Sequence, residues 1–150
     1  MEFRTIVDIE DPGFRIRPCE EMLFVGSCFA TEIGRRFQEE QFRATVNPYG
    51  VMYNPASILH TIQRLYSTAS SDLQSVKTAF LTLGTNHIYR LKETGEIVDN
   101  CQKRPQLLFT EEELSVDECA DYLRQTIDIL RQVNPEIHVV LTVSPIRYRK

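Results

Sequence analysis

Short apolar runs alternate with amphipathic stretches along this chain, and the alternation predicts strands and helices in turn. Apolar runs at residues 22–26, 79–83 and 137–143 are bounded by turn residues, a pattern typical of strands buried on both faces of a parallel sheet. A fourth, shorter strand is expected at 42–46, closed by the turn residues Asn47–Gly50.

Helices are expected between these strands. From Phe29 to about Glu39, apolar residues recur every three or four positions, which is the helical period. Asn54 caps a second predicted helix through about Tyr66, followed by a polar break, and Ser115 opens a third that runs to about Asn134.

The remaining segments read as surface features. Residues 88–91 and 96–98 flank a polar turn and predict a hairpin, while Glu111–Glu113 reads as a solvated acidic run before the last helix. Residues 3–9 suggest a short edge strand or arm that ends in the turn residues Asp11–Gly13.

Strands that alternate with helices predict the α/β class, with a parallel sheet and right-handed crossovers, in one domain over residues 1–150. In open sheets of this class, ligands bind at the carboxyl ends of the strands. The first strand ends at Gly26, so we expect the chemistry to lie near residues 26–30.

Charge and composition narrow the function classes. The chain has a net charge of −4 and a pI near 5.4, which disfavours nucleic acids and anionic membrane surfaces as partners and favours a small or neutral one. No apolar run approaches the roughly 18 residues of a membrane helix, and the first residues lack an apolar signal core. We therefore expect a cytoplasmic protein, with no membrane partner.

The four cysteines, Cys19, Cys28, Cys101 and Cys119, include no C-x-x-C pair. Spacing typical of a zinc site is thus absent, and free thiols are expected in a reducing compartment. The sequence predicts neither a metal nor an organic cofactor.

Several segments together resemble the bacterial GSCFA family. Gly26–Ala30 spells the motif that names it, and its other landmarks are similar to Asn47–Gly50, Tyr53–Pro55, Leu83–Thr85 and Thr142–Arg147. The family in turn resembles the SGNH/GDSL hydrolases, which usually hydrolyse or transfer acyl esters. The resemblance implies a three-layer α/β/α fold with a flavodoxin-like parallel sheet, and a small-molecule or carbohydrate-linked ester as substrate.

The hydrolase motif G-D-S, laid on Gly26, places Ser27 at the Asp position and Cys28 at the nucleophile position. The first turn of a helix also favours an anionic thiolate, which supports Cys28 independently of the resemblance. Two alternatives remain: Cys28 is a small buried apolar residue, or Ser27 is the nucleophile rather than a helix cap.

For the oxyanion hole, the resemblance implies the Asn86 side chain and a backbone N–H from the loop after the second strand, where Gly50 is the matching glycine. His87 replaces the Asp of the family-like G-x-N-D block. The Asp/His block that supplies the base in the hydrolases has no match before Lys150, so the sheet is expected to be incomplete at its carboxyl-terminal edge.

The resident histidines are weaker candidates for the base. His87 follows Asn86 and is expected either to contact substrate or pack, with general base as the lesser alternative, while His60 and His138 read as structural. Tyr49 and Tyr53 flank the Gly50 loop and either line a pocket or belong to the core.

A basic end formed by Arg147, Arg149 and Lys150 reads as solvated, with an anion contact as the alternative. Two functions stay open: an esterase or acyltransferase acting through Cys28, and a non-catalytic ligand-binding domain of the same fold. The sequence makes no statement about oligomeric state.

Overall fold

The computed structural model describes residues 8, 10–99 and 105–145, and it contains a four-stranded parallel sheet. The strands are β1 (Glu21–Gly26), β2 (Arg43–Val46), β3 (Val76–Leu83) and β7 (His138–Val143), and their order across the sheet is β2-β1-β3-β7. All three pairings are parallel. The predicted strands and their direction are therefore confirmed, with boundaries shifted by one to three residues.

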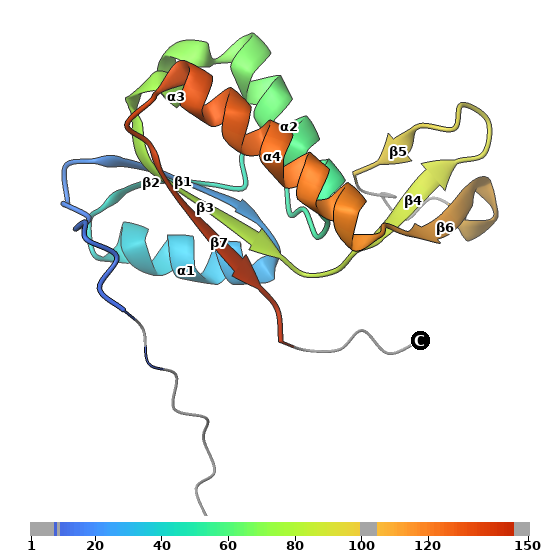
Figure 1. Cartoon of the computed structure of the whole chain (residues 1–150), viewed down its shortest axis with the longest axis horizontal. Helices are drawn as coiled ribbons and strands as arrows, with labels where there is room; N and C mark the ends of the chain where they lie inside the picture. The colour runs from blue at the N-terminus through green and yellow to red at the C-terminus, as the bar shows by residue number, and fades with distance from the viewer. Residues whose placement is uncertain (1–7, 9, 100–104, 146–150) are drawn as a thin grey trace, which may run out of the picture.

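Helices cover both faces of this sheet, as Figure 1 shows. Helix α1 (Cys28–Glu39) lies on one face, and α2 (Pro55–Thr68), α3 (Ser70–Ser75) and α4 (Val116–Val133) lie on the other. The α/β class is confirmed, and the arrangement of the layers is that of a three-layer α/β/α sandwich. Among the described residues, no helix combines the length and apolar character needed to cross a membrane.

Each face of the sheet buries its own apolar cluster. Leu23, Val25 and Leu81 point toward α2 and α4, where they pack with Ile58 and Leu130. The other face buries Met22 and Phe24 against Ala30 of α1. This alternation is why β1 reads as an uninterrupted apolar run rather than as a strand with one wet face.

A second, antiparallel sheet lies beside the first and was only partly predicted. The hairpin is confirmed as β4 (His87–Leu91) and β5 (Ile97–Val98), but β4 also pairs with β6 (Phe109–Glu113), which follows the short turn η1 (Gln106–Leu108). The acidic run is thus an edge strand, not merely a solvated lead into α4. Cross-strand charge pairing explains this: Arg90 on β4 holds Glu112 at 2.8 Å.

Two further differences concern where helices begin and end. The predicted polar break after Tyr66 is instead the end of α2 and the short helix α3, which buries only Leu73. Helix α1 begins at Cys28, one residue earlier than expected, because Ser27 is its cap.

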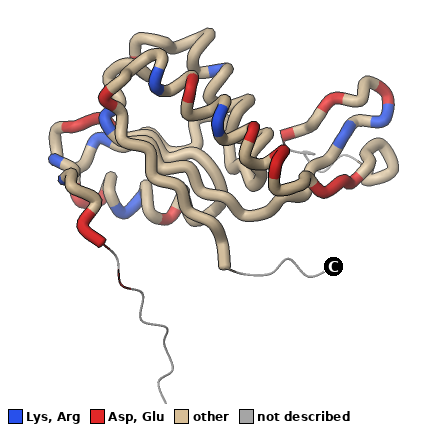
Figure 2. The backbone as a smooth tube through the Cα atoms, in the orientation of Figure 1, with Lys and Arg blue, Asp and Glu red and all other residues tan. Residues whose placement is uncertain are grey.

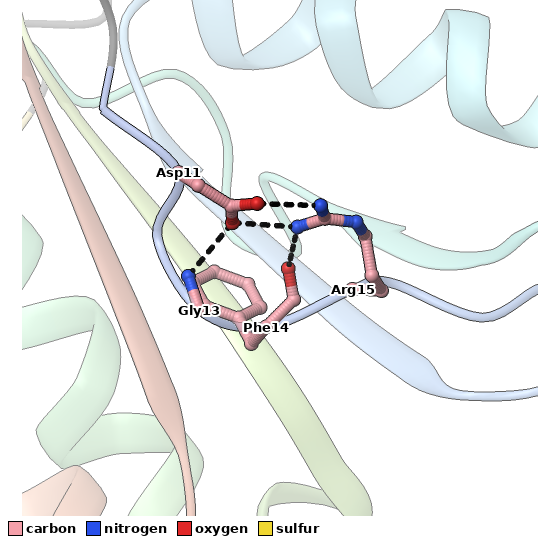
Figure 3. A network of polar contacts seen from close by, with 4 residues as sticks. All are labelled: Asp11, Gly13, Phe14 and Arg15. Carbon is pink, nitrogen blue, oxygen red and sulfur yellow. Dashed lines mark hydrogen bonds and ion pairs between the residues drawn. The ribbon is translucent and has the colours of Figure 1, made fainter.

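The amino-terminal turn forms as predicted. The Asp11 carboxylate accepts a hydrogen bond from the Gly13 N–H at 2.9 Å and pairs with Arg15 at 2.7 Å, as drawn in Figure 3. Gly13 has a φ of +74°, which glycine adopts without strain. The Arg15 guanidinium holds the pKa of Asp11 at about 2. The strand or arm expected at 3–9 lies almost entirely outside the described residues.

Candidate active site at the carboxyl edge of the sheet

The strand order reverses between β1 and β3. From β1 the chain passes through α1 to β2 on one side, then crosses back over β1 to β3, and β7 follows on the other side. Parallel sheets bind ligands in the crevice at such a reversal, outside the carboxyl ends of the two strands. Gly26 ends β1, Gly84 follows β3 and the turn with Gly50 follows β2, so these three glycines lie at the same edge of the sheet.

Gly26 brings the end of β1 into close contact with β3. Its φ is +143°, and a Cβ there would lie 2.8 Å from the backbone N of Thr82 and closer still to the Thr82 carbonyl oxygen. Only glycine fits both the conformation and the space. The next residue, Ser27, donates its N–H to the Thr82 carbonyl at 3.1 Å and to the Thr82 hydroxyl at 2.9 Å. The turn before α1 is therefore fastened to β3.

The Ser27 side chain is buried and hydrogen-bonded within the protein. It is only 7% exposed, and its hydroxyl accepts from the Phe29 N–H at 3.3 Å and shares a 3.0 Å hydrogen bond with the Thr82 hydroxyl. Such a side chain satisfies one of the free amides of the first helical turn. This environment fits the capping role of Ser27, whose hydroxyl is already hydrogen-bonded to Thr82 and Phe29.

Cys28 stands in contrast, as an exposed free thiol at the first residue of α1. The backbone N–H groups of a first helical turn have no acceptor within the helix and form the positive end of its dipole. Asn47 steadies this turn from the side of β2, because its side-chain oxygen accepts from the Gly26 N–H and its amide donates to Thr31, both at 2.9 Å. An exposed thiol thus sits on a rigid turn at the edge where sheets of this class bind ligands.

The two predicted oxyanion donors have other partners. The Gly50 N–H donates to the Asn47 carbonyl at 2.9 Å and so closes the turn, which corrects its expected availability as a donor. Asn86 donates from its side-chain amide to the Leu114 carbonyl at 2.8 Å, and its own carbonyl accepts from the Leu114 N–H at 3.0 Å. Asn86 therefore ties the β3–β4 loop to the start of α4, and one of its two amide hydrogens is engaged there.

His87 begins β4 and lies among acidic side chains. The side chain is buried, with Nδ1 2.9 Å from a Glu111 oxygen and Nε2 3.6 Å from a Glu113 oxygen. The acidic run of β6 thus encloses the imidazole, which joins the two strands. This environment fits the packing alternative for His87 better than a free base near Cys28.

The other two histidines have partners of their own. His60 on α2 shares a 2.7 Å hydrogen bond with Asp99, and this bond raises the pKa of His60 despite partial burial, which lowers it. His138 begins β7 at the opposite edge and stacks on Phe14 with ring centroids 4.1 Å apart. An open hollow lined in part by Phe14 and His138 is also at that opposite edge, far from the strand ends that carry the glycines. The basic end at 147–150 lies outside the described residues.

The two tyrosines that flank Gly50 have different environments. Tyr49 packs under the Arg64 guanidinium, 4.0 Å from its ring centroid, and its hydroxyl shares a 3.0 Å hydrogen bond with Thr68 of α2. Tyr53 stays 49% exposed beside Gly84. Sequence reasoning did not identify Thr82 or Asn47 as parts of this site, because the contacts that define them join residues 16 to 55 positions apart.

Within the part of the chain that the structure describes, no three His, Cys, Asp or Glu side chains gather to hold a metal ion. Comparison with known families gives one finding, a match to the sequence pattern of the GSCFA family over residues 21–76 and 62–150. The two matched pieces overlap around α3. Neither the curated proteins nor the solved structures gave a match to this chain.

Proposed function

The chain belongs to the GSCFA family, and from that starting point we propose that it is an acyl-transfer domain in which Cys28 takes the acyl group from an ester. The observation that carries this proposal is the contrast between two neighbours. Ser27 is buried and hydrogen-bonded to Thr82, whereas Cys28 is exposed at the helix start, where the strand order reverses. The family's resemblance to the SGNH/GDSL hydrolases points to the same chemistry.

In the proposed reaction the Cys28 thiolate attacks the ester carbonyl carbon and forms a tetrahedral oxyanion. The C–O bond to the alcohol then breaks, the alkoxide takes a proton from solvent, and the acyl group remains on Sγ as a thioester. Water or a second alcohol then attacks the thioester carbon and gives its proton to solvent, the C–S bond breaks, and Cys28 leaves as the thiolate while the acid or a new ester is released. The step is redox-neutral and needs no cofactor.

The oxyanion needs donors that are fixed in advance. The Cys28 N–H is suited to this role, since it belongs to the open first turn of α1. Asn86 is the second candidate, because an amide has two N–H bonds and only one is used on Leu114. Gly50 is not included, since its N–H closes the preceding turn.

Turnover by Cys28 requires a group that accepts and returns a proton, and we expect this requirement to limit the rate. Each of the three histidines is engaged elsewhere: His60 with Asp99, His87 with Glu111, and His138 with the Phe14 ring. We therefore expect acylation to proceed without a histidine base, and deacylation to be slow.

The test is to incubate the chain with p-nitrophenyl acetate, quench in acid and map acetyl groups by peptide mass spectrometry. Cys28 should acquire acetyl fastest, and Cys28→Ala should lose that label. Cys19 is the matched control within the chain, as a second exposed thiol with no helix start beside it. Equal labelling of Cys28 and Cys19, or acetyl on Ser27, would contradict the proposed nucleophile.

The engagement of all three histidines favours a second candidate, a domain that binds a ligand at the same edge without turnover. The discriminating result is a Cys28 that stays unacetylated, while phenyl acetate in excess protects it from iodoacetamide. That outcome would replace acyl transfer with binding.

A further inference from the structure

The loops around Cys28 carry no formal charge. Residues 26–31, 47–57 and 83–86 contain no Lys, Arg, Asp or Glu, and the charged positions lie mainly on the outer helices and the β4–β5–β6 hairpins, as Figure 2 shows. These loops offer a ligand hydroxyls, amides and apolar surface rather than formal charges. The composition of these loops therefore fits an uncharged ligand.

Tyr53 is a large, half-exposed aromatic side chain that lies beside Gly84 at this edge. Gly84 lies between the Tyr53 ring and the turn before Cys28: a Cβ on Gly84 would be 3.2 Å from Tyr53 Cδ1 and 3.5 Å from the Ser27 Cβ. The ring thus flanks the residue that precedes the nucleophile, with the bare backbone of Gly84 between them.

The backbone of Tyr53 is fixed on both sides. Its carbonyl accepts the N–H groups of Gly84 and Thr85, at 2.9 and 3.0 Å, and the preceding residue, Met52, donates to the Gly26 carbonyl at 2.9 Å. The following residue caps α2. A half-exposed aromatic ring on such a rigid segment loses little entropy when a ligand packs against it.

We propose that Tyr53 is a specificity-determining residue whose ring packs against the alcohol part of an uncharged ester, so that the site prefers alcohols that carry a ring. This inference rests on the proposed acyl transfer to Cys28. A stacked or edge-to-face pair of rings adds about three- to tenfold to binding beyond the area it buries. A linear or branched alcohol of equal acidity lacks that gain.

The experiment compares acetylation of Cys28 by phenyl acetate and by hexafluoroisopropyl acetate, two uncharged esters whose leaving alcohols are both acidic but of which only one has a ring. Each rate constant is divided by that of N-acetylcysteine with the same ester, which cancels intrinsic reactivity. The normalised preference for phenyl acetate should be about three- to tenfold.

Four variants locate the preference. Tyr53→Phe should keep it and Tyr53→Leu should abolish it, while Gly84→Ala should reduce it because the new Cβ pushes on the ring. Tyr66→Leu is the matched control: this tyrosine is 41% exposed near the far end of α2 and its loss should change nothing.

Two outcomes would overturn the inference while leaving acyl transfer intact: no preference in the wild type, or a preference that survives in Tyr53→Leu. Failure of the proposed function looks different, since neither ester would then acetylate Cys28 at all.

Discussion

Replacement of Gly26 by alanine tests the close contact between the end of β1 and the Thr82 backbone of β3. Alanine at a φ of +143° incurs backbone strain of about 1–3 kcal/mol. The added Cβ also overlaps the backbone of Thr82, which cannot move without separating two paired central strands. We expect a total loss of about 4 kcal/mol, a large part of the roughly 5–15 kcal/mol that stabilises a domain. For 150 residues this lowers the melting temperature by about 8–16 °C.

Gly50→Ala is the matched control, because this glycine also has a positive φ, +99°, but a Cβ there meets no atom within 4 Å. Strain alone should cost about 1–2 kcal/mol, or about 2–8 °C. Thermal unfolding followed by circular dichroism measures both variants. If Gly26→Ala unfolds within about 2 °C of Gly50→Ala, the overlap with Thr82 is not a real constraint on the fold.

Three further outcomes follow from the described contacts. With iodoacetamide at about pH 7, Cys28 at the start of α1 should react faster than Cys19, which has no helix start beside it, and Cys119 should react slowest, because burial, together with Glu118, raises the pKa of its thiol; site-resolved mass spectrometry decides the order. The hydrogen bond to Asp99 raises the pKa of His60 above its ordinary value near 6.5, so the pair stabilises the fold below about pH 6.5 and this contribution fades as the pH rises through the raised pKa. His60→Gln should therefore lower the melting temperature by about 1–2 °C at about pH 5.5 and less at about pH 8.5, and an equal effect at both values would refute the pairing. Steady-state ester turnover by this chain should stay about 10⁴-fold below that of triad hydrolases, and efficient turnover in a spectrophotometric assay would mean that one of the engaged histidines acts as base after all.

The sheet was predictable because its signals are local. Each parallel strand is a short apolar run that ends in turn residues, and each flanking helix has its own cap, such as Ser115 with Glu118 on α4. These features need no knowledge of the rest of the chain. That is why the four strands and three longer helices could be located from the sequence.

The segments that escaped prediction lack such signals. Strand β6 consists largely of acidic residues, and only its partners His87 and Arg90 on β4 explain why Glu111–Glu113 is extended. Helix α3 has one buried side chain, Leu73, so no apolar period marks it. Both depend on contacts with distant parts of the chain, which a local pattern does not contain.

The site was likewise predictable only in its local features. The motif around Cys28 and the glycines at the strand ends are visible in the sequence, but the choice between Ser27 and Cys28 stayed open. Two observations in the folded structure bear on this choice. Ser27 is hydrogen-bonded to the Thr82 hydroxyl, 55 residues away, and Cys28 is exposed. The prior engagement of the Gly50 N–H is likewise visible only in the folded turn.

The fastening of Ser27 to Thr82 also bears on how the protein is made. During synthesis the motif at 26–30 emerges long before β3, and the turn that orients Cys28 lacks its hydrogen bonds to Thr82 until β3 pairs with β1. Contacts of such sequence separation form late, since the loop between them must close first. Nascent chains therefore carry the motif without the site. The thiol reaches its final position only when the sheet is complete. The rate at which Cys28 is labelled during folding should therefore report when β1 pairs with β3.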